Sequence, residues 1–436
     1  MNLVFVFADQ MRAGCCGFDG NSLASTPNFD HLAATGLHFS NCVSGTPVCG
    51  PWRGCFFTGQ YPLTHGVFLN DLRLPTDRPT LGTILKQAGY ETGYIGKWHL
   101  DGADRGGFIP PGPRRQGFDF WAAANCSHNY FESHYYRDTP EPQTWSGYDA
   151  IAQTDEAIRF IKNASQPFAL VMSWGPPHDP YEMVPPEYLD KVPLEKVQVP
   201  PNCPNPDMND MRGYHAHISA LDEQIGRLTT TLDECGLTDD TIFIFTSDHG
   251  DMLGSQNHTQ KQVPWNESIK VPLLIRAPMQ FAAGAQTQTL FNVWDFLPTL
   301  LGLLDIPCPG TVEGLDLSEG VRSKIFQGPE STLACAIAPF GRYHGRPWRA
   351  AITRQHTYAR NLNGPWLLYD NIADPFQTHN LVNRPESTAL QTELAADLQR
   401  LLESAGDDFQ PAPTHLARFG YEVEANGARP YYNSLT

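Results

Sequence analysis

The sequence predicts an α/β fold, in which a large, mostly parallel sheet is sandwiched by helices and a smaller C-terminal α+β domain carries a short antiparallel sheet. Two observations predict it. Short apolar runs alternate with amphipathic helical patterns along most of the chain, and after about Gly320 this alternation gives way to patterns of antiparallel strands. We therefore expect a large α/β domain over residues 1–325 and an α+β domain with a tail over residues 326–436.

Three continuous apolar runs are typical of strands that are buried on both faces. They cover residues 3–8, 168–173 and 241–246. Parallel strands need a long crossover connection, usually a helix, and helical patterns do lie between these runs. We expect all three runs to be central strands of the large sheet.

Helices are indicated by their ends or by their apolar spacing. Thr26 and Pro27 are typical of a helix start, and Gly36 is typical of its end. A longer helix is indicated by apolar residues three and four apart, namely Tyr214, Ile218, Leu221, Ile225, Leu228 and Leu232. In the C-terminal domain we expect antiparallel strands over 349–360 and 366–369, a helix over 388–402, and a proline-containing tail from Gln410 onward.

The composition narrows the class of protein. The 436 residues carry a formal net charge of −17, which argues against non-specific binding to nucleic acid. No apolar run approaches the roughly 18 residues that a membrane span needs. The ten scattered cysteines are typical of reduced, buried thiols. The first residues lack the features of a signal peptide, so we expect a cytoplasmic protein, or a periplasmic or secreted one whose leader has been trimmed.

Polar side chains follow the predicted strands. Asp9 and Gln10 come after the first strand, Asp248 and His249 come after the third, and His178 follows the second. Because ligands bind beyond the carboxyl ends of parallel strands, we expect these residues to meet at one edge of the sheet. Carboxylate and amide oxygens suit a hard divalent cation, and we predict a site for calcium, with magnesium as the alternative. Taken singly, each residue is equally well explained as an ordinary loop residue.

A cysteine and an arginine lie at a predicted helix start. Pro51 is typical of a first helical turn and Gly59 of a helix end, so Cys49 falls just before the helix N-terminus. Backbone N–H groups and the helix dipole favour anions there. Arg53 lies four residues on and projects from the same face of the helix. On spacing alone, a buried structural cysteine beside a surface arginine is the simpler interpretation.

Cys49, Pro51 and Arg53 form the pattern Cys-x-Pro-x-Arg, which is followed by Thr58-Gly59 and His65-Gly66. Together with the strand-end residues, this pattern resembles the signature of the formylglycine-dependent sulfatases, the type I sulfatases of the alkaline phosphatase superfamily. Further blocks occur in the family's order: Gly96-Lys97-Trp98-His99, Pro177-His178-Asp179-Pro180-Tyr181, Lys261, Leu368-Tyr369-Asp370 and Asp374-Pro375. The resemblance covers nearly the whole chain and implies an alkaline-phosphatase-like fold.

The chain departs from the family pattern at three places. Trp52 stands where many members have serine, and Gln10 stands where many have a second acid. Residues 256–260, before Lys261, do not match the sequence that is more common in the family at this place, and the role of His258 therefore stays open.

The resemblance implies that Cys49 is oxidised after synthesis to formylglycine, a post-translational modification made by a formylglycine-generating enzyme. One hydroxyl of the hydrated aldehyde attacks sulfur, and the other later expels sulfate as the aldehyde re-forms. The resemblance also implies that the metal, which lowers the pKa of the attacking hydroxyl, is held by Asp9, Gln10, Cys49, Asp248 and His249.

The remaining family residues are implied to bind the sulfuryl group and to move protons. Arg53 holds the hydrated aldehyde, Lys97 contacts the nucleophile and the sulfate, and His99 takes the proton that lets sulfate leave. His178 and Lys261 bind sulfate oxygens, and His178 protonates the departing alcohol. We expect Lys97 and His99 to point the same way along an extended segment, because they are two residues apart. For an isolated Lys-x-His pair, a solvated surface position is the alternative.

We predict a sulfuric ester hydrolase that acts on a sulfate monoester, with a carbohydrate as the organic part and neither nucleic acid nor membrane as a partner. Aromatic and hydrogen-bonding side chains suit a sugar, and arginines suit its anionic groups. The candidate substrate-binding residues are Arg105, Asn125, His128 and Arg346, in neighbourhoods that also contain Arg114, Arg115, Asn129, Tyr130, His134, Tyr135, Tyr136, Arg342, His344 and Arg349. An ordinary irregular surface explains them equally well.

Two other functions stay open. A phosphonate monoester hydrolase or phosphodiesterase of the same superfamily also uses Asp-Gln, formylglycine and Asp-His. Such relatives usually lack the Lys-x-His pair that Lys97 and His99 form here. A protein that only binds sulfated glycans is the second alternative, and intact Cys49, Arg53 and metal ligands argue against it.

Overall fold

The computed structural model describes residues 1–165, 167–281, 284–341 and 346–425. Within these residues the large sheet has nine strands in the order β11-β2-β10-β8-β1-β7-β3-β4, and β9 pairs with β2. Only the pairs that involve β9 and β10 are antiparallel, so the prediction of a mostly parallel sheet is confirmed. The strands are β1 (Asn2–Asp9), β2 (Leu37–Val43), β3 (Glu91–Lys97), β4 (Phe120–Ala124), β7 (Phe168–Pro177), β8 (Thr241–Ser247), β9 (Lys270–Val271), β10 (Leu273–Arg276) and β11 (Ala285–Asn292).

Strand β1 lies inside the sheet between β7 and β8, and its side chains enter two different apolar layers. Leu3, Phe5 and Phe7 belong to one layer, whereas Val4 and Val6 belong to the other. Because both faces of the strand are covered, its sequence is continuously apolar instead of alternating. The same reasoning applies to the predicted strands 168–173 and 241–246, which are the cores of β7 and β8.

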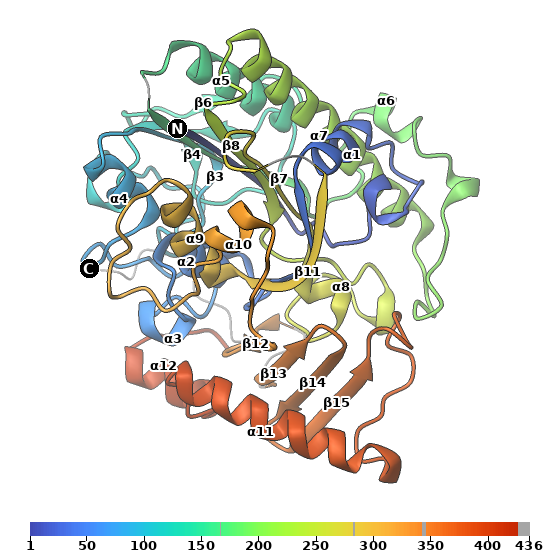
Figure 1. Ribbon diagram of the computed structural model, residues 1–436. Coiled ribbons are helices and arrows are strands. Elements are labelled where there is room, and N and C mark those ends of the chain that lie inside the picture. Colours follow the sequence, from blue (N-terminus) through green and yellow to red (C-terminus); the bar gives the residue numbers. More distant parts are fainter. Residues whose placement is uncertain (166, 282–283, 342–345, 426–436) are drawn as a thin grey trace.

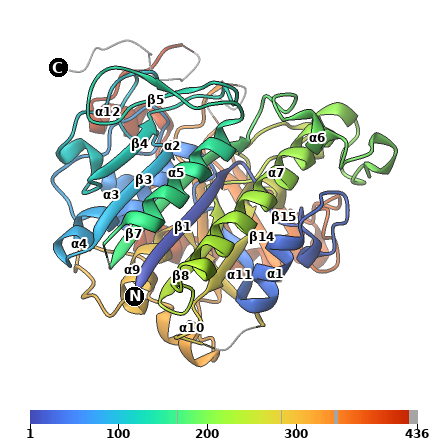
Figure 2. The same ribbon diagram turned by 90° about the horizontal axis from the view of Figure 1, so that it is seen from above.

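Helices cover both faces of this sheet. On one face α5 and α7 lie side by side across the strands, and Figure 2 shows them from above with α1 beside α7. This layer contains α1 (Pro27–Thr35), α5 (Asp149–Asn163), α6 (Pro186–Leu189) and α7 (Met208–Glu234). The opposite layer contains α2 (Cys49–Thr58), α3 (Pro62–His65), α4 (Leu81–Gln87), α9 (Phe296–Leu303) and α10 (Ser318–Ser323), and α8 (Asn266–Ile269) lies just before β9. None of the described helices is both long and apolar enough to cross a membrane.

The predicted helices occupy their expected positions, with one difference at a cap. Helix α1 begins after Thr26 and ends at Gly36, but the Thr26 side chain makes no capping bond. Instead Asp222 of α7 accepts hydrogen bonds from the backbone N–H groups of Asn28 and Phe29, at 3.0 and 2.7 Å. A residue far along the chain therefore satisfies donors that the local sequence assigned to Thr26.

A separate four-stranded antiparallel sheet follows, with α11 lying along it (Figure 1). The expected strands and helix are confirmed, whereas β12 was not predicted, and the expected proline-containing tail contains α12. The elements are β12 (Ser331–Ala336), β13 (Trp348–Thr353), β14 (His356–Asn361), β15 (Gly364–Asp370), α11 (Thr388–Ser404) and α12 (Ala412–Phe419). A short hairpin, β5 (His134–Tyr135) with β6 (Gln143–Thr144), lies after β4. The predicted boundary at residues 325 and 326 falls between α10 and β12, and the division into two domains stays a prediction.

The C-terminal sheet packs against a segment that carries one of the predicted site residues. Trp265, just before α8, and Ile269, the last residue of α8, share an apolar cluster with Ala334 of β12 and Trp348 of β13. The indole N–H of Trp348 donates a hydrogen bond to the carbonyl oxygen of Gln262, at 2.7 Å. The small sheet therefore fixes the chain next to Lys261.

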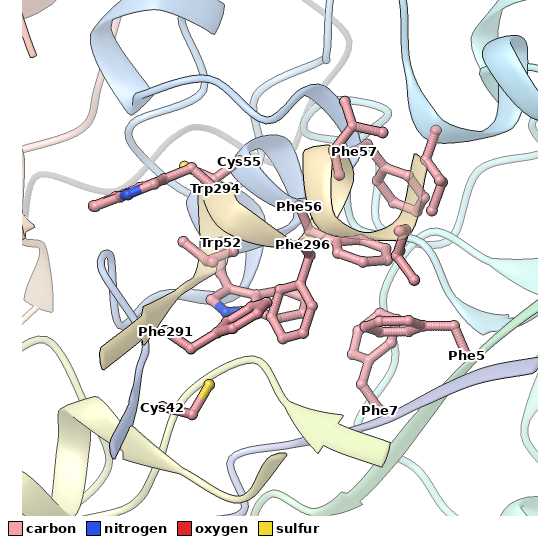
Figure 3. Close-up of a cluster of buried hydrophobic side chains, with 14 of the residues drawn as sticks. Phe5, Phe7, Cys42, Trp52, Cys55, Phe56, Phe57, Phe291, Trp294 and Phe296 are labelled. Carbon is pink, nitrogen blue, oxygen red and sulfur yellow. The ribbon is translucent and has the colours of Figure 1, made fainter. Parts of the chain in front are cut away.

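An aromatic cluster attaches α2 to the central strand (Figure 3). The Trp52 ring stacks on the Phe56 ring, with centroids 5.3 Å apart, and lies 5.2 Å from the Phe7 ring. Phe56 also lies 4.5 Å from Phe5 and 5.9 Å from Phe296 of α9. Trp52, where many members of the resembling family have serine, thus faces the core and contributes to the position of α2.

Removing the Phe56 ring should destabilise the fold. Phe56→Ala leaves a cavity among five rings, and we expect the free energy of unfolding to fall by about 3–5 kcal/mol. Ile372→Ala is the control, because Ile372 is 70% exposed and its loss should change stability by less than about 0.5 kcal/mol. Denaturant unfolding followed by tryptophan fluorescence measures both. Equal stabilities of the two variants would show that the cluster does not hold α2.

Candidate active site

Four side chains from two strand ends and a helix start meet at one edge of the large sheet. Asp9, Cys49, Asp248 and His249 each place one potential ligand atom within 4.8 Å of the others, and all four residues are buried. Sγ of Cys49 lies 3.2 Å from Nε2 of His249 and 3.6 Å from Oδ1 of Asp9. Cys49 is the first residue of α2, two positions earlier than the helix start that Pro51 suggested.

Buried cations compensate the two carboxylates. Nη2 of Arg53 lies 3.5 Å from Oδ2 of Asp9 and 3.3 Å from Oδ2 of Asp248, and Nζ of Lys97 lies 2.5 Å from Oδ2 of Asp9. Burial alone would raise the pKa of Asp9, but Lys97 and the other nearby cations hold that pKa well below its usual value. Burial and the charge of Asp9 raise the pKa of Asp248. This pair of close carboxylates is therefore incompletely compensated.

The donor set fits a divalent cation. Oδ2 of each carboxylate faces Arg53, whereas Oδ1 of Asp9, together with Nε2 of His249, faces Cys49. A cation among these atoms would offset the repulsion that raises the pKa of Asp248, and carboxylate oxygens are the ligands that hard cations prefer. The four residues can therefore hold a metal ion.

A second group of acidic side chains in the described residues does not fit a divalent cation in this way. Asp407, Asp408 and His415 also lie close together. Asp407, however, forms a buried ion pair with Arg349, and Asp408 pairs with Arg418. Because each carboxylate already has its own arginine, we assign no metal to this group.

The Gln10 side chain is fixed in one orientation. Its Oε1 accepts a hydrogen bond from Nζ of Lys261 at 2.6 Å, and its Nε2 donates to Oδ2 of Asp251 at 2.8 Å. Its backbone N–H donates to Oδ1 of Asp248 at 3.0 Å. Gln10 therefore connects the carboxylates to Lys261, and its role as a metal ligand stays a prediction.

His178 and Lys261 form a close pair beside this group. Nε2 of His178 lies 2.5 Å from Nζ of Lys261, and the His178 ring stacks on the ring of His128 with centroids 4.0 Å apart. Burial and the charges of Lys261 and His128 hold the pKa of His178 well below its usual value. His178 is therefore neutral, and its Nε2 accepts a hydrogen bond from Lys261.

The expectation of an extended Lys97–His99 segment is wrong. Strand β3 ends at Lys97, and His99 has a left-handed backbone with φ of 57°. Nε2 of His99 lies 3.1 Å from Oδ1 of Asp71, whereas Lys97 reaches Asp9. Burial lowers the pKa of His99, whereas the nearby Cys126 and the hydrogen bond to Asp71 raise it. The two side chains thus both reach Cys49 because the chain turns between them.

Three of the candidate substrate residues lie in this neighbourhood or next to it. His128 is partly exposed and stacks on His178. Arg105 is 27% exposed and forms two contacts with Asp71, at 2.8 and 3.0 Å. Asn125 is buried, and its amide bonds to the backbone of the loop 101–104. Asn125 therefore holds that loop, and contact with substrate is not its role in this structure.

The other candidates divide into exposed and buried residues. Arg346 is exposed and lines a separate hollow of about 380 Å³ with Asn361, Asn363 and Trp366. Arg115 is buried against the carbonyl oxygens of Ile109 and Arg137, so neither it nor Arg349 is available to a substrate. Tyr130 and Tyr135 are also buried, Arg114 pairs with Asp101, and Arg342 and His344 lie outside the described residues.

Three buried residues of the site were not predicted. Asp71 contacts His99, Cys126 lies beside His99 and His128, and Asp251 orients Gln10. Each stands outside the motifs that drew attention to the others. The available signals were positions: Asn70 and Asp71 interrupt the otherwise apolar run of residues 67–72, Asp251 directly follows Asp248-His249-Gly250, and Cys126 stands between Asn125 and His128.

Comparisons with known proteins agree with this geometry. The Sulfatase family model matches residues 1–306, and the model described as N-sulphoglucosamine sulphohydrolase, C-terminal, matches residues 254–404. The chain is 40% identical to the ulvan-active sulfatase of Formosa agariphila over 99% of this chain and 87% of that protein. It is 25% identical to the N-acetylglucosamine-6-O-sulfatase of Bacteroides thetaiotaomicron over 93% of this chain and 87% of that protein. The crystal structure of YidJ from Bacteroides fragilis superimposes with a TM-score of 0.86 at 29% identity, covering 94% and 96% of the two chains.

Neutralising either carboxylate should weaken the binding of a divalent cation. Loss of a residue that only hydrogen-bonds to a metal ligand typically lowers metal affinity by roughly 10- to 100-fold. For Asp9→Asn and Asp248→Asn we expect the calcium affinity to fall by more than that, because each substitution changes a ligand itself. Asp408→Asn is the matched control, because it removes an acid of the arginine-paired group and should leave calcium binding unchanged. Titration calorimetry and metal analysis after dialysis measure the effect. A wild-type protein that takes up no divalent cation would contradict this assignment.

Proposed function

The chain belongs to the sulfatase family and is a sulfuric ester hydrolase, and from this premise we propose that it hydrolyses a sulfate monoester of a carbohydrate at the pocket around Cys49. The observation that carries the proposal is the position of Cys49 at the start of α2, within reach of Asp9, Asp248 and His249. The predicted alkaline-phosphatase-like α/β fold with a small antiparallel sheet is confirmed.

Cys49 is the residue that becomes formylglycine, and the formylglycine-generating enzyme is therefore a partner of this chain. Formylglycine supplies a hydrated aldehyde whose hydroxyl is the nucleophile toward sulfur. Arg53 is already fixed for its role beside it, because its Nη1 donates to the carbonyl oxygen of Lys97 at 2.5 Å and to Oγ of Ser173 at 2.7 Å. A buried guanidinium held in this way offsets the charge of Asp9 and Asp248 without needing to move.

Asp9, Asp248 and His249 hold the metal ion, with Gln10 and residue 49 completing the set. The ion is calcium, because most of these donors are oxygen atoms, and magnesium is the alternative. When bound, the cation supplies positive charge that stabilises an anionic nucleophile and polarises an oxygen of the sulfate.

The remaining face of the pocket binds the sulfuryl group and moves protons. Lys97 and Lys261 carry the positive charges that sulfate oxygens require. Neutral His178 accepts a hydrogen bond from Lys261, so the pair holds a proton that it can donate to the alcohol oxygen as the bond from that oxygen to sulfur breaks. His99 takes the proton whose removal allows sulfate to leave. Acid–base assistance of this kind contributes roughly 10²- to 10⁴-fold to a rate.

A carbohydrate is the organic part of the substrate. The relatives at 40% and 25% identity are an ulvan-active sulfatase and an N-acetylglucosamine-6-O-sulfatase, which supports a saccharide here. His128 and Arg105 are partly exposed beside the pocket, and they suit the hydroxyl and anionic groups of a sugar. Arg346, in its separate hollow with Trp366, is a candidate for a more distant sugar unit.

The alternative functions are less well supported. A phosphodiester needs room for a second ester arm, and in this pocket Lys97 and His99 stand among the residues around Cys49. A protein that only binds glycans would need neither a buried cysteine beside two carboxylates nor an arginine locked against them.

The first test asks whether residue 49 is modified and whether sulfatase activity depends on it. Produced together with a formylglycine-generating enzyme, the chain should carry formylglycine at residue 49 and release sulfate from at least one of a panel of defined sulfated saccharides. Cys49→Ala should fold and release none, because it has no nucleophile. Mass spectrometry of the peptide and ion chromatography of sulfate measure the two properties. Cys235→Ala, which alters an exposed cysteine, is the control, and full activity of Cys49→Ala would refute the mechanism.

The second test separates sulfate monoesters from diesters. The wild type should show a higher kcat/KM on an aryl sulfate than on a matched aryl phosphonate monoester or diester. Replacing Lys97 and His99 together by alanine should reduce sulfatase activity far more than diesterase activity, because only the monoester loses contacts that stabilise its transition state. Lys86→Ala removes an exposed lysine and is the control. A wild type that prefers the diester, or a double variant that loses both activities equally, would move the chain to the rival class.

A further inference from the structure

Asp71 lies at the centre of a buried polar group that no sequence motif includes. Its Oδ1 is 3.1 Å from Nε2 of His99 and 2.8 Å from Nε of Arg105, and its Oδ2 is 3.0 Å from Nη2 of Arg105. Asp71 is 3% exposed and His99 is 1% exposed, so water does not compete for these contacts. Arg105 therefore keeps Asp71 ionised, and Asp71 accepts the hydrogen bond of the His99 ring.

The backbone conformations of both Asp71 and His99 support the contact between their side chains. Asp71 and His99 both have left-handed backbones, with φ of 62° and 57°, a conformation that few residues other than glycine adopt. Such conformations persist only where the surrounding structure enforces them, and they concentrate at functional sites. The neighbouring Asn70 accepts a hydrogen bond from the backbone N–H of Gly50 at 2.8 Å. The segment 70–71 thus contacts both His99 and the residue that follows Cys49.

The two nitrogens of the His99 ring have different surroundings. Nε2 faces Asp71, whereas Nδ1 is buried and has no nitrogen or oxygen atom of the described residues as a hydrogen-bond partner. The sulfur atoms of Cys49 and Cys126 lie beside the ring. Because the partner of one ring nitrogen decides which nitrogen carries the proton, a carboxylate at Nε2 leaves Nδ1 as the nitrogen that exchanges a proton at residue 49.

We propose that Asp71 is a positioning residue for His99: together with Arg105 it fixes the ring in one orientation with a proton on Nε2, so that Nδ1 faces the nucleophile. This inference rests on the proposed function, because it assigns the reaction step to His99. Arg105, a candidate for substrate binding, thereby gains a second role, because its ion pair with Asp71 stabilises the site independently of any contact with substrate.

The test uses one isosteric substitution and two readouts. Asp71→Asn removes the charge and keeps the shape. In the chain with unmodified Cys49, ¹⁵N-edited NMR of the wild type should show a downfield Nε2–H signal that His99→Gln removes and that Asp71→Asn loses or shifts upfield. In the matured enzyme, Asp71→Asn should lower kcat by at least about 100-fold. KM should stay within about threefold, since the residue does not bind the substrate.

The matched control is Asp101→Asn. Asp101 is also buried and pairs with Arg114 and Arg73, but it makes no contact with His99 among the described residues, so kcat should stay within about threefold of the wild type. An equal loss of kcat in both variants would show that breaking any buried ion pair near the site lowers activity. A raised KM at unchanged kcat would instead place Asp71 in substrate binding. Either result overturns the proposal, as does a wild type without the Nε2–H signal, which is readable even if Asp71→Asn fails to fold. A matured wild type that releases no sulfate would instead refute the proposed function, and the NMR result would still stand.

Discussion

Two carboxylates, Asp9 and Asp248, lie close together in the interior with neither exposed, and Arg53 contacts both. Burying charge is costly unless it is paired and hydrogen-bonded, so the position of this arginine constrains everything around it. Arg53 is on α2, and α2 is held on β1 by the stacked rings of Trp52 and Phe56. The aromatic cluster and the polar site are thus neighbours on one helix, because the guanidinium carbon of Arg53 lies 4.8 Å from the centre of the Phe7 ring that Trp52 also contacts.

The other half of the pocket depends on a different support. Lys261 lies on a segment that packs against the C-terminal sheet, where Trp348 bonds to the carbonyl oxygen of Gln262. Lys261 in turn contacts Gln10 and His178. The C-terminal sheet therefore contributes to the site through the residues it holds in place, whereas its own residues Asn361 and Trp366 line a separate hollow together with Arg346.

The departures from the family pattern have physical counterparts in the structure. Trp52 fills the core beneath α2, so a small polar residue there would give up much of that contact. Gln10, where many members have an acid, adds no further negative charge beside Asp9 and Asp248, and Asp251 turns its amide oxygen toward Lys261. A carboxylate at this position would place a third negative charge in a group whose pKa values already reflect repulsion.

The sequence by itself determined the fold class and most of the pocket. Continuous apolar runs specify strands buried on both faces, and polar residues directly after such runs must lie at one edge of a parallel sheet, which is why Asp9, Asp248 and His178 were placed correctly relative to their strands. Spacing also located Cys49 at a helix start. Periodicity failed at Lys97 and His99, because a left-handed residue turns the chain and no two-residue pattern encodes that turn.

Tertiary structure alone decided which polar residues serve the site and which serve the fold. Asn125, Arg115 and Arg349 had the residue types of a sugar-binding surface, yet their partners are backbone carbonyls or a buried acid brought together by folding. Asp71 and Asp251 carried no motif and still contact His99 and Gln10. A side chain's role follows from the residue that it contacts. When that residue lies tens or hundreds of positions away, the local sequence pattern does not encode the contact.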